Sequence, residues 1–161
     1  MKLDAKTMTV LKNYSQINPS VLFKEGNVLT TIAPNKSILA KATVPDNFER
    51  RCAIYEISKF LGGISIAEDP EISFEDNAVT IKDKTSVQRI PYAAETTIKA
   101  PPEKNLVLPS IDVSFDITEA NVKNALKAAG VYGLPNIAFV GNGSELSVQA
   151  LDAKIPNGNV Y

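Results

Sequence analysis

The sequence lacks histidine and tryptophan altogether and contains a single cysteine among its 161 residues. Without histidine, the chain has neither the most common general base nor the most common zinc ligand. A lone cysteine cannot form a disulfide bond within the chain. No stretch approaches the roughly 20 apolar residues of a membrane span, and the first ten residues do not resemble a signal peptide. We therefore expect a cytoplasmic protein without catalytic residues, metal, cofactor or membrane association.

The remaining composition is that of an ordinary globular protein. Hydrophobic residues make up 44% of the chain, and 17 basic residues nearly balance 18 acidic ones. A chain of this length can bury roughly 70% of its unfolded surface, which is enough to fold without disulfide bonds. The composition therefore predicts one large domain or one and a half smaller ones.

Residues 1–92 follow the order helix, strands, helix, strands. Apolar residues from Leu3 to Ile17 recur at helical spacing, and Asp4 is a suitable N-cap. A second helix is predicted over residues 51–61, with Gly62-Gly63 as its end. Alternating patterns and turn residues predict a three-stranded meander after the first helix and four strands after the second. The predicted strands cover residues 21–24, 28–32, 37–44, 64–67, 71–74, 78–82 and 86–92.

Residues 93–109 lose periodicity, contain three prolines and carry mixed charge, which is typical of a connector between domains. After it, we expect a strand over 111–115, a helix over 118–129 that ends before Gly130, and a hairpin. The hairpin strands cover 136–140 and 146–151, with Gly141-Asn142-Gly143 at the turn. The sequence thus divides into a first domain over 1–92, the connector over 93–109 and a partial second domain over 110–161.

The second half repeats part of the first. Leu11-Lys12 aligns with Leu126-Lys127 at an offset of 115 residues, and later pairs align at 116 and 117. Those later pairs are Pro19 with Pro135, Phe23 with Phe139, Gly26 with Gly143 and Leu29 with Leu146. Because the order of elements is shared as well, we interpret the pattern as an internal duplication whose second copy is incomplete. The alternative is two unrelated α+β pieces.

Several runs of residues carry a family resemblance. These are the opening MKL, LKNYSQINPSVLFKEG at residues 11–26, AIYEISKFLGGISI at 53–66 and EISFEDNAVTIKD at 71–83. Together with the proline-rich connector before a second helical copy, they resemble the sliding clamp of T-even-type bacteriophages. That family provides the processivity factor of the replicative DNA polymerase. The resemblance is good over residues 1–109 and looser beyond them.

The resemblance implies an α+β DNA-clamp fold with two similar domains of antiparallel sheets and helices on one face, the second domain being truncated. It also implies that three chains close head to tail into a homotrimeric ring, with the helices lining a hole for double-stranded DNA. Its partners would be DNA of any sequence and the tails of the DNA polymerase and the clamp loader. The location implied for such a phage protein is the host cell cytoplasm.

A protein that holds DNA without reading its sequence needs diffuse positive charge toward the phosphates. On a helical wheel, lysines and amides occupy the face opposite the apolar stripe in both copies of the helix, and acids are confined to the first turns. By contrast, Glu68, Asp69, Glu71, Glu75 and Asp76 fall in nine residues without a basic residue. The expected DNA-facing residues are Lys2, Lys6, Lys12, Lys59, Lys123 and Lys127. Such lysines also occur on helices that simply face solvent.

The connector supplies a second candidate surface. Its apolar residues are Ile98, Leu106, Val107 and Leu108, in a segment too rich in proline to build its own core. The resemblance places a hydrophobic pocket for partner tails at this junction, so these four are the candidate partner-binding residues. The alternative is that they pack the two domains together.

Other signals carry less information. Gly141-Asn142-Gly143-Ser144 resembles part of a phosphate loop but is better explained as a hairpin turn. Cys52 is expected to be a small buried side chain at the start of the second helix. Arg50 and Arg51 would begin that helix, where positive charge is unfavourable, so Glu49 or an acid across an interface could pair with them.

Two functional classes remain open. The first is a non-catalytic clamp subunit that encircles duplex DNA and tethers the polymerase. The alternative is a β-rich interaction or virion scaffold protein that does not bind DNA. An enzyme is the least favoured class, because the sequence shows no cluster of acids suited to catalysis.

Overall fold

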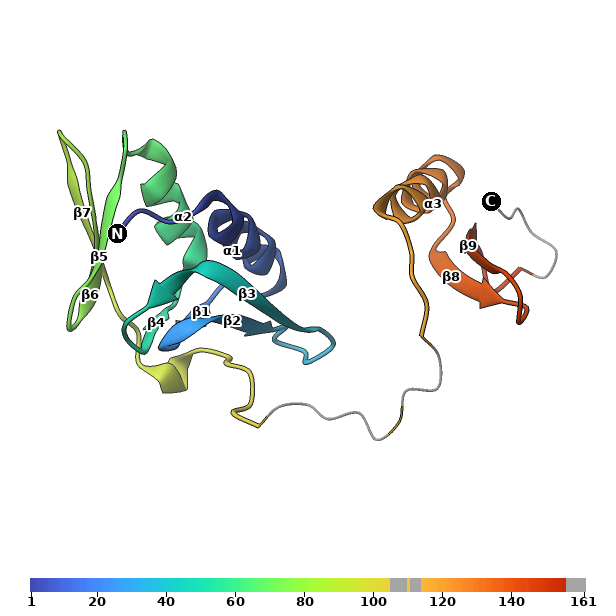
Figure 1. The fold of residues 1–161 in the computed structure, drawn as a ribbon, viewed down its shortest axis with the longest axis horizontal. Helices are drawn as coiled ribbons and strands as arrows, with labels where there is room; N and C mark the ends of the chain where they lie inside the picture. The colour runs from blue at the N-terminus through green and yellow to red at the C-terminus, as the bar shows by residue number, and fades with distance from the viewer. Residues whose placement is uncertain (105–109, 111–113, 156–161) are drawn as a thin grey trace. The chain divides into compact units, whose positions relative to one another are not determined.

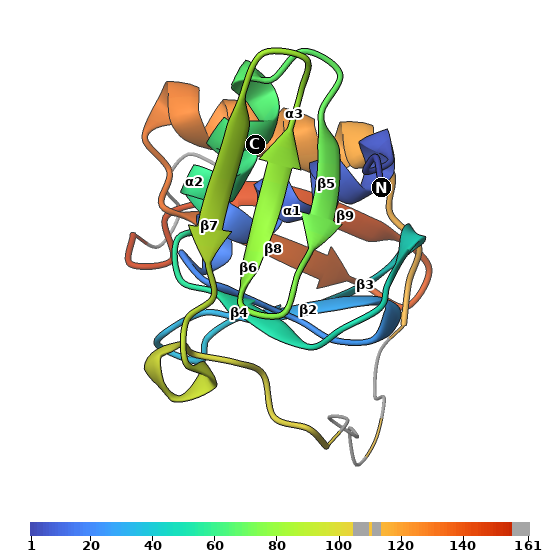
Figure 2. The same ribbon diagram turned by 90° about the vertical axis from the view of Figure 1, so that its left-hand side faces the viewer.

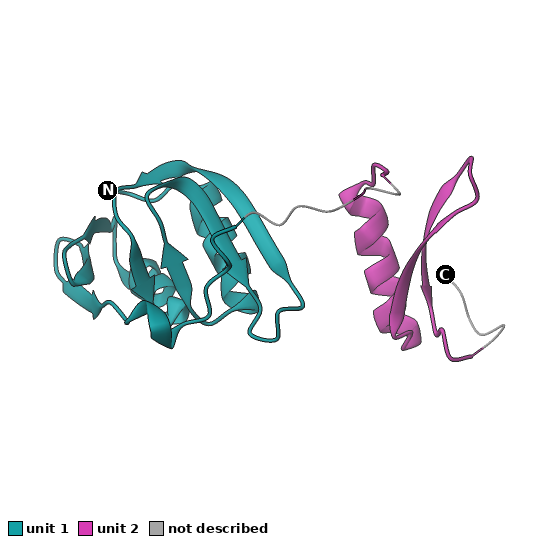
Figure 3. Cartoon of the chain, turned by 90° about the horizontal axis from the view of Figure 1, so that it is seen from below, with its two compact units in different colours: residues 1–105 teal, residues 106–161 magenta. Residues whose placement is uncertain are grey.

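The computed structural model describes residues 1–104, 110 and 114–155 of the chain. The chain divides into two units, Met1–Asn105 and Leu106–Tyr161, which Figure 3 draws in teal and magenta. The fold is α+β, with antiparallel sheets and three α-helices in the described residues. None of the described helices is long and apolar enough to cross a membrane.

Helix α1 (Ala5–Ile17) begins where the sequence predicts. The side chain of Asp4 accepts a hydrogen bond from the backbone N–H of Lys6 at 2.7 Å, which confirms it as the N-cap. One side of the helix is buried through Thr7, Leu11 and Tyr14. The Tyr14 hydroxyl donates to the carbonyl of Leu29 at 3.2 Å, and this bond fixes the rotation of α1 against strand β2 (Gly26–Ile32).

Helix α2 (Ile57–Ile66) begins and ends later than predicted. The helix expected over residues 51–61 is wrong, because Cys52–Ile54 form strand β4 and the helix starts at Ile57. Gly62 and Gly63 do not end it, and residues 64–66 continue the helix instead of forming a strand. A Cβ on Gly63 would lie 2.7 Å from Oε1 of Gln88 and 2.9 Å from Cδ1 of Ile81. Glycine is therefore needed there for close packing of the helix on its sheet.

The strands of the first unit form three small antiparallel sheets. One pairs β1 (Val21–Phe23) with β4, another pairs β2 with β3 (Leu39–Phe48), and the third has the order β5-β6-β7. Strands β5 (Glu71–Phe74), β6 (Ala78–Lys82) and β7 (Val87–Pro91) lie side by side in Figure 2 and confirm three predicted strands. The predicted meander is wrong, because β1 leaves β2 and pairs with β4, Val21 lying opposite Ile54.

Aromatic rings form the centre of the first unit. Phe23, Phe48 and Phe60 are almost completely buried, and the ring centroids of Phe23 and Phe48 are 4.7 Å apart. Phe74 of β5 contacts all three rings at centroid distances of 5.3 to 6.4 Å. One cluster thus joins β1, β3, α2 and β5, so the helices and the sheets share a single core.

Residues 93–104, which we call the strap, cover the outer face of the β1–β4 ladder. Figure 1 shows the strap in yellow beside these strands. The N–H of Ala93 donates to the carbonyl of Ala53 at 2.9 Å, and Ile98 packs on Leu22 and Ala53. The side-chain amide of Asn18 donates to the carbonyl of Lys99 at 2.9 Å. The strap explains why every residue of β1 and β4 is buried, since both faces of this ladder are covered.

The second unit contains α3 (Glu119–Tyr132) and the hairpin β8 (Asn136–Gly141) with β9 (Leu146–Leu151), which confirms the predicted helix and hairpin. The helix continues past Gly130 and ends at Gly133, which adopts φ 65°. The strand predicted over 111–115 lies partly outside the described residues, and Ser114 and Phe115 are not in a strand. The order helix, strand, strand recurs in both units, but β8 pairs with the next strand and β1 does not. The internal duplication stays a prediction.

Candidate nucleic-acid interface

The lysines of α1 lie on its exposed face. Because Leu11 and Tyr14 fix the buried side, Lys6 and Lys12 are held toward solvent together with Asn13 and Gln16. At about 100° per residue, Lys6 and Lys12 are about 120° apart around the helix, so their charges spread over the exposed face. Neither lysine forms an ion pair within the described ranges. Such a face can attract phosphate without fixed contacts to bases.

Helix α2 packs against α1 and adds Lys59 to the candidate residues. The Lys59 side chain is 72% exposed and forms an ion pair with Glu56, three residues earlier. This local pair reduces the net charge at that point of the surface. Lys59 is therefore a weaker candidate for phosphate contact than Lys6 or Lys12.

Lys2 precedes α1 and does not belong to its exposed face. Its ammonium lies 2.7 Å from a carboxylate oxygen of Asp69. This hydrogen bond and charge lower the pKa of Asp69 below its ordinary value. Lys2 thus joins the start of the chain to the turn before β5, and the carboxylate of Asp69 opposes its charge locally.

In the second unit, α3 carries Lys123 and Lys127 on exposed positions. Lys123 pairs with Glu119 one turn earlier at 2.7 Å, whereas Lys127 has no ion-pair partner in the part of the chain described. The buried residues of α3 are Ala125 and Ala128. Leu126, which the sequence places in the apolar stripe, is 55% exposed. The reason is that the helix turns its small residues toward the hairpin.

The acidic segment around β5 is more ordered than a solvated turn. Arg50 donates to the backbone carbonyl of Glu75 at 2.7 Å and to the carboxylate of Asp76 at 3.0 Å. Asp69 pairs with Lys2, and Glu75 lies 3.8 Å from Arg89. The role expected for Arg50 as the first residue of a helix is therefore wrong, because it holds the β5–β6 turn instead.

Arg51 anchors the strap. Its guanidinium donates two hydrogen bonds of 2.7 Å to Glu95 and one of 3.0 Å to Glu103, which also pairs with Lys24 at 3.0 Å. The pKa of Glu95 is lowered by the bond from Arg51, and the pKa of Glu103 is lowered first by Lys24 and then by Arg51. Arg51 does not begin a helix, so that expectation is wrong too. The mixed charge of the connector was the sequence signal for this network.

The four candidate partner-binding residues of the connector are only partly described. Ile98 is 9% exposed, and its side chain packs from the strap onto Leu22 and Ala53. Leu106, Val107 and Leu108 lie outside the described residues. The side chain of Ile98 thus stabilises the first unit, and partner binding by this set of residues stays a prediction.

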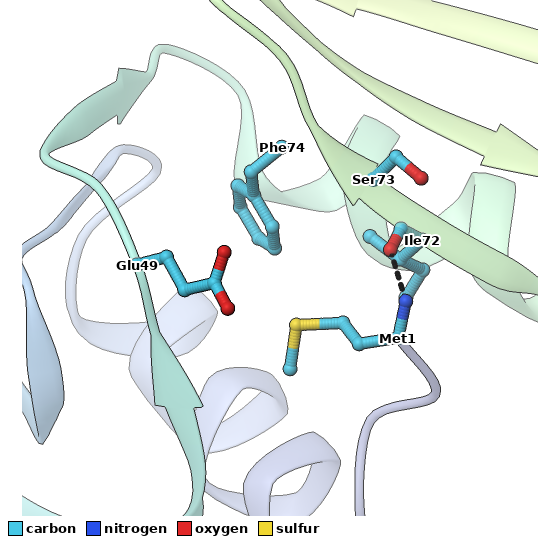
Figure 4. Close-up of a pocket in the computed structure, with 5 residues that line it drawn as sticks. All are labelled: Met1, Glu49, Ile72, Ser73 and Phe74. Atoms are coloured by element: carbon cyan, nitrogen blue, oxygen red, sulfur yellow. Dashed lines mark hydrogen bonds between the residues drawn. The ribbon is translucent and has the colours of Figure 1, made fainter.

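A pocket of about 270 Å³ lies beside β5 (Figure 4). It is lined by Met1, Glu49, Ile72, Ser73 and Phe74, and Met1 forms backbone hydrogen bonds with Ile72 in both directions. Glu49 is its one ionisable side chain, and the α-amino group of Met1 donates to the carbonyl of Ile72 at 2.6 Å. Among the residues described, no three acidic or cysteine side chains are arranged to hold a metal ion.

Cys52 is buried, as predicted, although it lies in β4 and not in a helix. Burial raises the pKa of its thiol to about 11. Since the thiolate is the nucleophile, this cysteine is unreactive at neutral pH. Its role is packing in the core beside Phe23.

The sequence of this chain is similar to that of known proteins. The sequence profile of the family described as DNA polymerase processivity factor matches residues 2–99. The chain is 31% identical over 141 residues to the sliding clamp of Enterobacteria phage T4, covering 86% of this chain and 61% of the relative. It is 28% identical to the sliding clamp of Escherichia phage RB69, and the alignment covers 92% of this chain and 65% of the relative. It is 25% identical to the sliding clamp of Vibrio phage KVP40, and the alignment covers 96% of this chain and 72% of the relative. The chain thus spans less than two thirds of the T4 and RB69 relatives.

Proposed function

This chain belongs to the DNA polymerase processivity factor family, and we propose that it acts as a sliding-clamp subunit that encircles duplex DNA and tethers a replicative DNA polymerase. The observation that carries the proposal is the profile match over residues 2–99, which includes α1 and α2 with their exposed lysines. The protein would have no catalytic step of its own. It would increase the length of each synthesis event by preventing the polymerase from leaving the template.

The proposed DNA-facing residues are Lys2, Lys6, Lys12, Lys59, Lys123 and Lys127. Lysine suits a sliding surface because its charge sits on a flexible stem and makes few fixed contacts with phosphate. Retention would come mainly from encirclement, so the affinity for DNA that the ring does not enclose should be low and strongly dependent on salt. Lys6, Lys12 and Lys127 should contribute most, because the ion pairs of Lys2, Lys59 and Lys123 oppose their charges.

We further propose that three copies close head to tail into a ring, as the family resemblance implies. The tails of the polymerase and the clamp loader would bind near the connector, with Leu106, Val107 and Leu108 as candidates and Ile98 as the residue that holds the connector to the first unit. The proposed location is the cytoplasm of the infected host. Sedimentation equilibrium of the full chain tests the ring, since a trimer supports it and a monomer contradicts it.

A charge-reversal variant tests the DNA role. Replacing Lys6, Lys12, Lys123 and Lys127 by Glu should abolish stimulation of the polymerase on a long primed circular template, because the DNA-facing surface would then repel phosphate. The measured quantity is product length in the presence of the clamp loader. Far-ultraviolet circular dichroism checks that the variant folds.

A matched control makes the same change of charge elsewhere. Lys36, Lys41, Lys82 and Lys84 are exposed and lie outside the three α-helices and the connector, so their replacement by Glu should leave product length nearly unchanged. Equal losses in both variants would mean that only total charge matters. Full stimulation by the first variant, or indifference of the polymerase to the unmodified protein, would favour a scaffold protein without a DNA role.

A further inference from the structure

The β8–β9 turn contains an asparagine whose side-chain oxygen accepts several hydrogen bonds. Asn142 follows the end of β8, and its side-chain oxygen Oδ1 accepts three hydrogen bonds. The donors are the N–H of Ser144 at 3.0 Å, the hydroxyl of Ser144 at 3.1 Å and the N–H of Glu145 at 2.8 Å. All of these residues are exposed to solvent. The turn therefore polarises the Asn142 side-chain carbonyl in the presence of water.

The next residue, Gly143, has a backbone nitrogen without a neighbouring side chain. Gly143 has φ 92°, and a Cβ built on it would have no atom within 4 Å. Its N–H donates no hydrogen bond among the described residues. Glycine has no side chain to crowd its own backbone nitrogen, so that nitrogen can approach Cγ of Asn142 with little steric cost. The three donors point at the oxygen on which negative charge develops during such an attack, and they would stabilise it.

We propose that Asn142 is a site of spontaneous deamidation in the folded chain. The backbone nitrogen of Gly143 forms a bond to Cγ of Asn142, the bond from Cγ to the side-chain nitrogen breaks, and ammonia leaves with the proton from Gly143. Water then opens the five-membered imide at either carbonyl, which gives aspartate or isoaspartate. Each event changes the net charge from −1 to −2. Isoaspartate also lengthens the backbone by one carbon in the turn that joins β8 to β9.

The first unit supplies a matched control. Oδ1 of Asn35 accepts the N–H of Ser37 at 3.0 Å and its hydroxyl at 2.6 Å, which repeats the Asn142–Ser144 arrangement. The residue between them is Lys36 instead of glycine. Lys36 also has a positive φ, of 61°, but its N–H donates to the carbonyl of Ala33 at 2.7 Å, so the two turns differ both in the side chain next to the attacking nitrogen and in the hydrogen bond of that nitrogen. We expect Asn142 to react about tenfold faster than Asn35, which corresponds to about 1.4 kcal/mol in the barrier.

The experiment is incubation of the full folded chain at mildly alkaline pH, followed by tryptic digestion and mass spectrometry. Cleavage after Lys127 and Lys154 separates Asn142 from Asn157, which also precedes a glycine. The aspartate and isoaspartate products are separated by chromatography and counted together. The expected result is an amide-to-acid mass change in the peptide that contains Asn142, with the peptide of Asn35 unchanged over the same time.

Two variants test the cause. Gly143→Ala should slow the change at Asn142, and Lys36→Gly should speed the change at Asn35, to a rate below that of Asn142 because the N–H at position 36 donates to the carbonyl of Ala33. The second variant keeps the test decisive even if the first one disturbs its turn. Equal rates at Asn142 and Asn35, no gain from Lys36→Gly, or reaction of Asn142 only after unfolding in urea would each overturn the proposal.

Discussion

Adding one methyl group at Gly63 should destabilise the protein, although the same change at its neighbour Gly62 should stabilise it. Both residues lie inside α2, where alanine is favoured over glycine by about 1 kcal/mol. A Cβ on Gly62 would meet nothing within 4 Å, so Gly62→Ala should gain most of this amount. The pair therefore offers two identical substitutions in one helix with opposite expected signs.

The packing at Gly63 decides the sign there. Its added Cβ would lie 2.9 Å from Cδ1 of Ile81, which is completely buried in β6. It would also lie 2.7 Å from Oε1 of Gln88, whose amide donates to the Gly63 carbonyl at 3.3 Å. Overpacking of this kind costs about 1–3 kcal/mol, which equals or exceeds the gain in helix propensity. Because the propensity gain is the same at both positions, we expect Gly63→Ala to be less stable than Gly62→Ala by the overpacking cost of about 1–3 kcal/mol.

Thermal unfolding followed by far-ultraviolet circular dichroism measures the difference. For a unit of about 100 residues, 1 kcal/mol shifts the melting temperature by roughly 4–8 °C, so the two variants should melt at least about 4 °C apart. Urea unfolding provides the same comparison at constant temperature. The reasoning would be refuted if Gly63→Ala melted at or above Gly62→Ala, because the α2–sheet contact would then have room for a side chain.

Two further predictions concern buried and charged groups. The hydroxyl of Thr7 is buried without a hydrogen-bond partner, so Thr7→Val should raise the free energy of unfolding in urea by about 1 kcal/mol. Thr9→Val on the exposed face should change this free energy little. A loss of stability in Thr7→Val would contradict the prediction. The N–H groups of Thr85 and Ser86 lower the pKa of Asp83 to about 2. The folded state thus favours the charged form, and this stabilisation is complete above about pH 4 and lost as the pH falls toward about 2. The urea midpoint of Asp83→Asn should depend less on pH in that window than that of the unmodified chain, and parallel pH profiles would argue against it.

Helices with one continuous polar face were predictable from the sequence. Asp4 and the apolar spacing up to Ile17 located α1 within two residues, because capping and periodicity are local properties. The region after Arg50 was not predictable in the same way. Cys52–Ile54 are three consecutive buried residues, which look alike in a helix and in a strand covered on both faces. Gly63 was interpreted as a helix end because nothing in the sequence shows that another element approaches it.

Strand pairing and side-chain partners depend on the tertiary structure. Neighbouring strands usually pair, yet β1 pairs with β4 across an intervening hairpin. The exposure of Lys6 and Lys12 followed from the helical wheel, whereas the pairing of Lys2 with Asp69 joins residues far apart in the sequence. The same holds for Arg51 with Glu95, which turned an aperiodic connector into a docked segment.

The strap also determines how tension would travel along the chain. A pull applied beyond Lys104 would first load the ion pairs of Glu103 with Lys24 and Arg51, then the Asn18 bond to Lys99 and the buried Ile98. These contacts resist sliding along β1 and β4 together, and none of them involves the β5-β6-β7 sheet. The last strand of that sheet, β7, is therefore shielded from being peeled away while the strap holds.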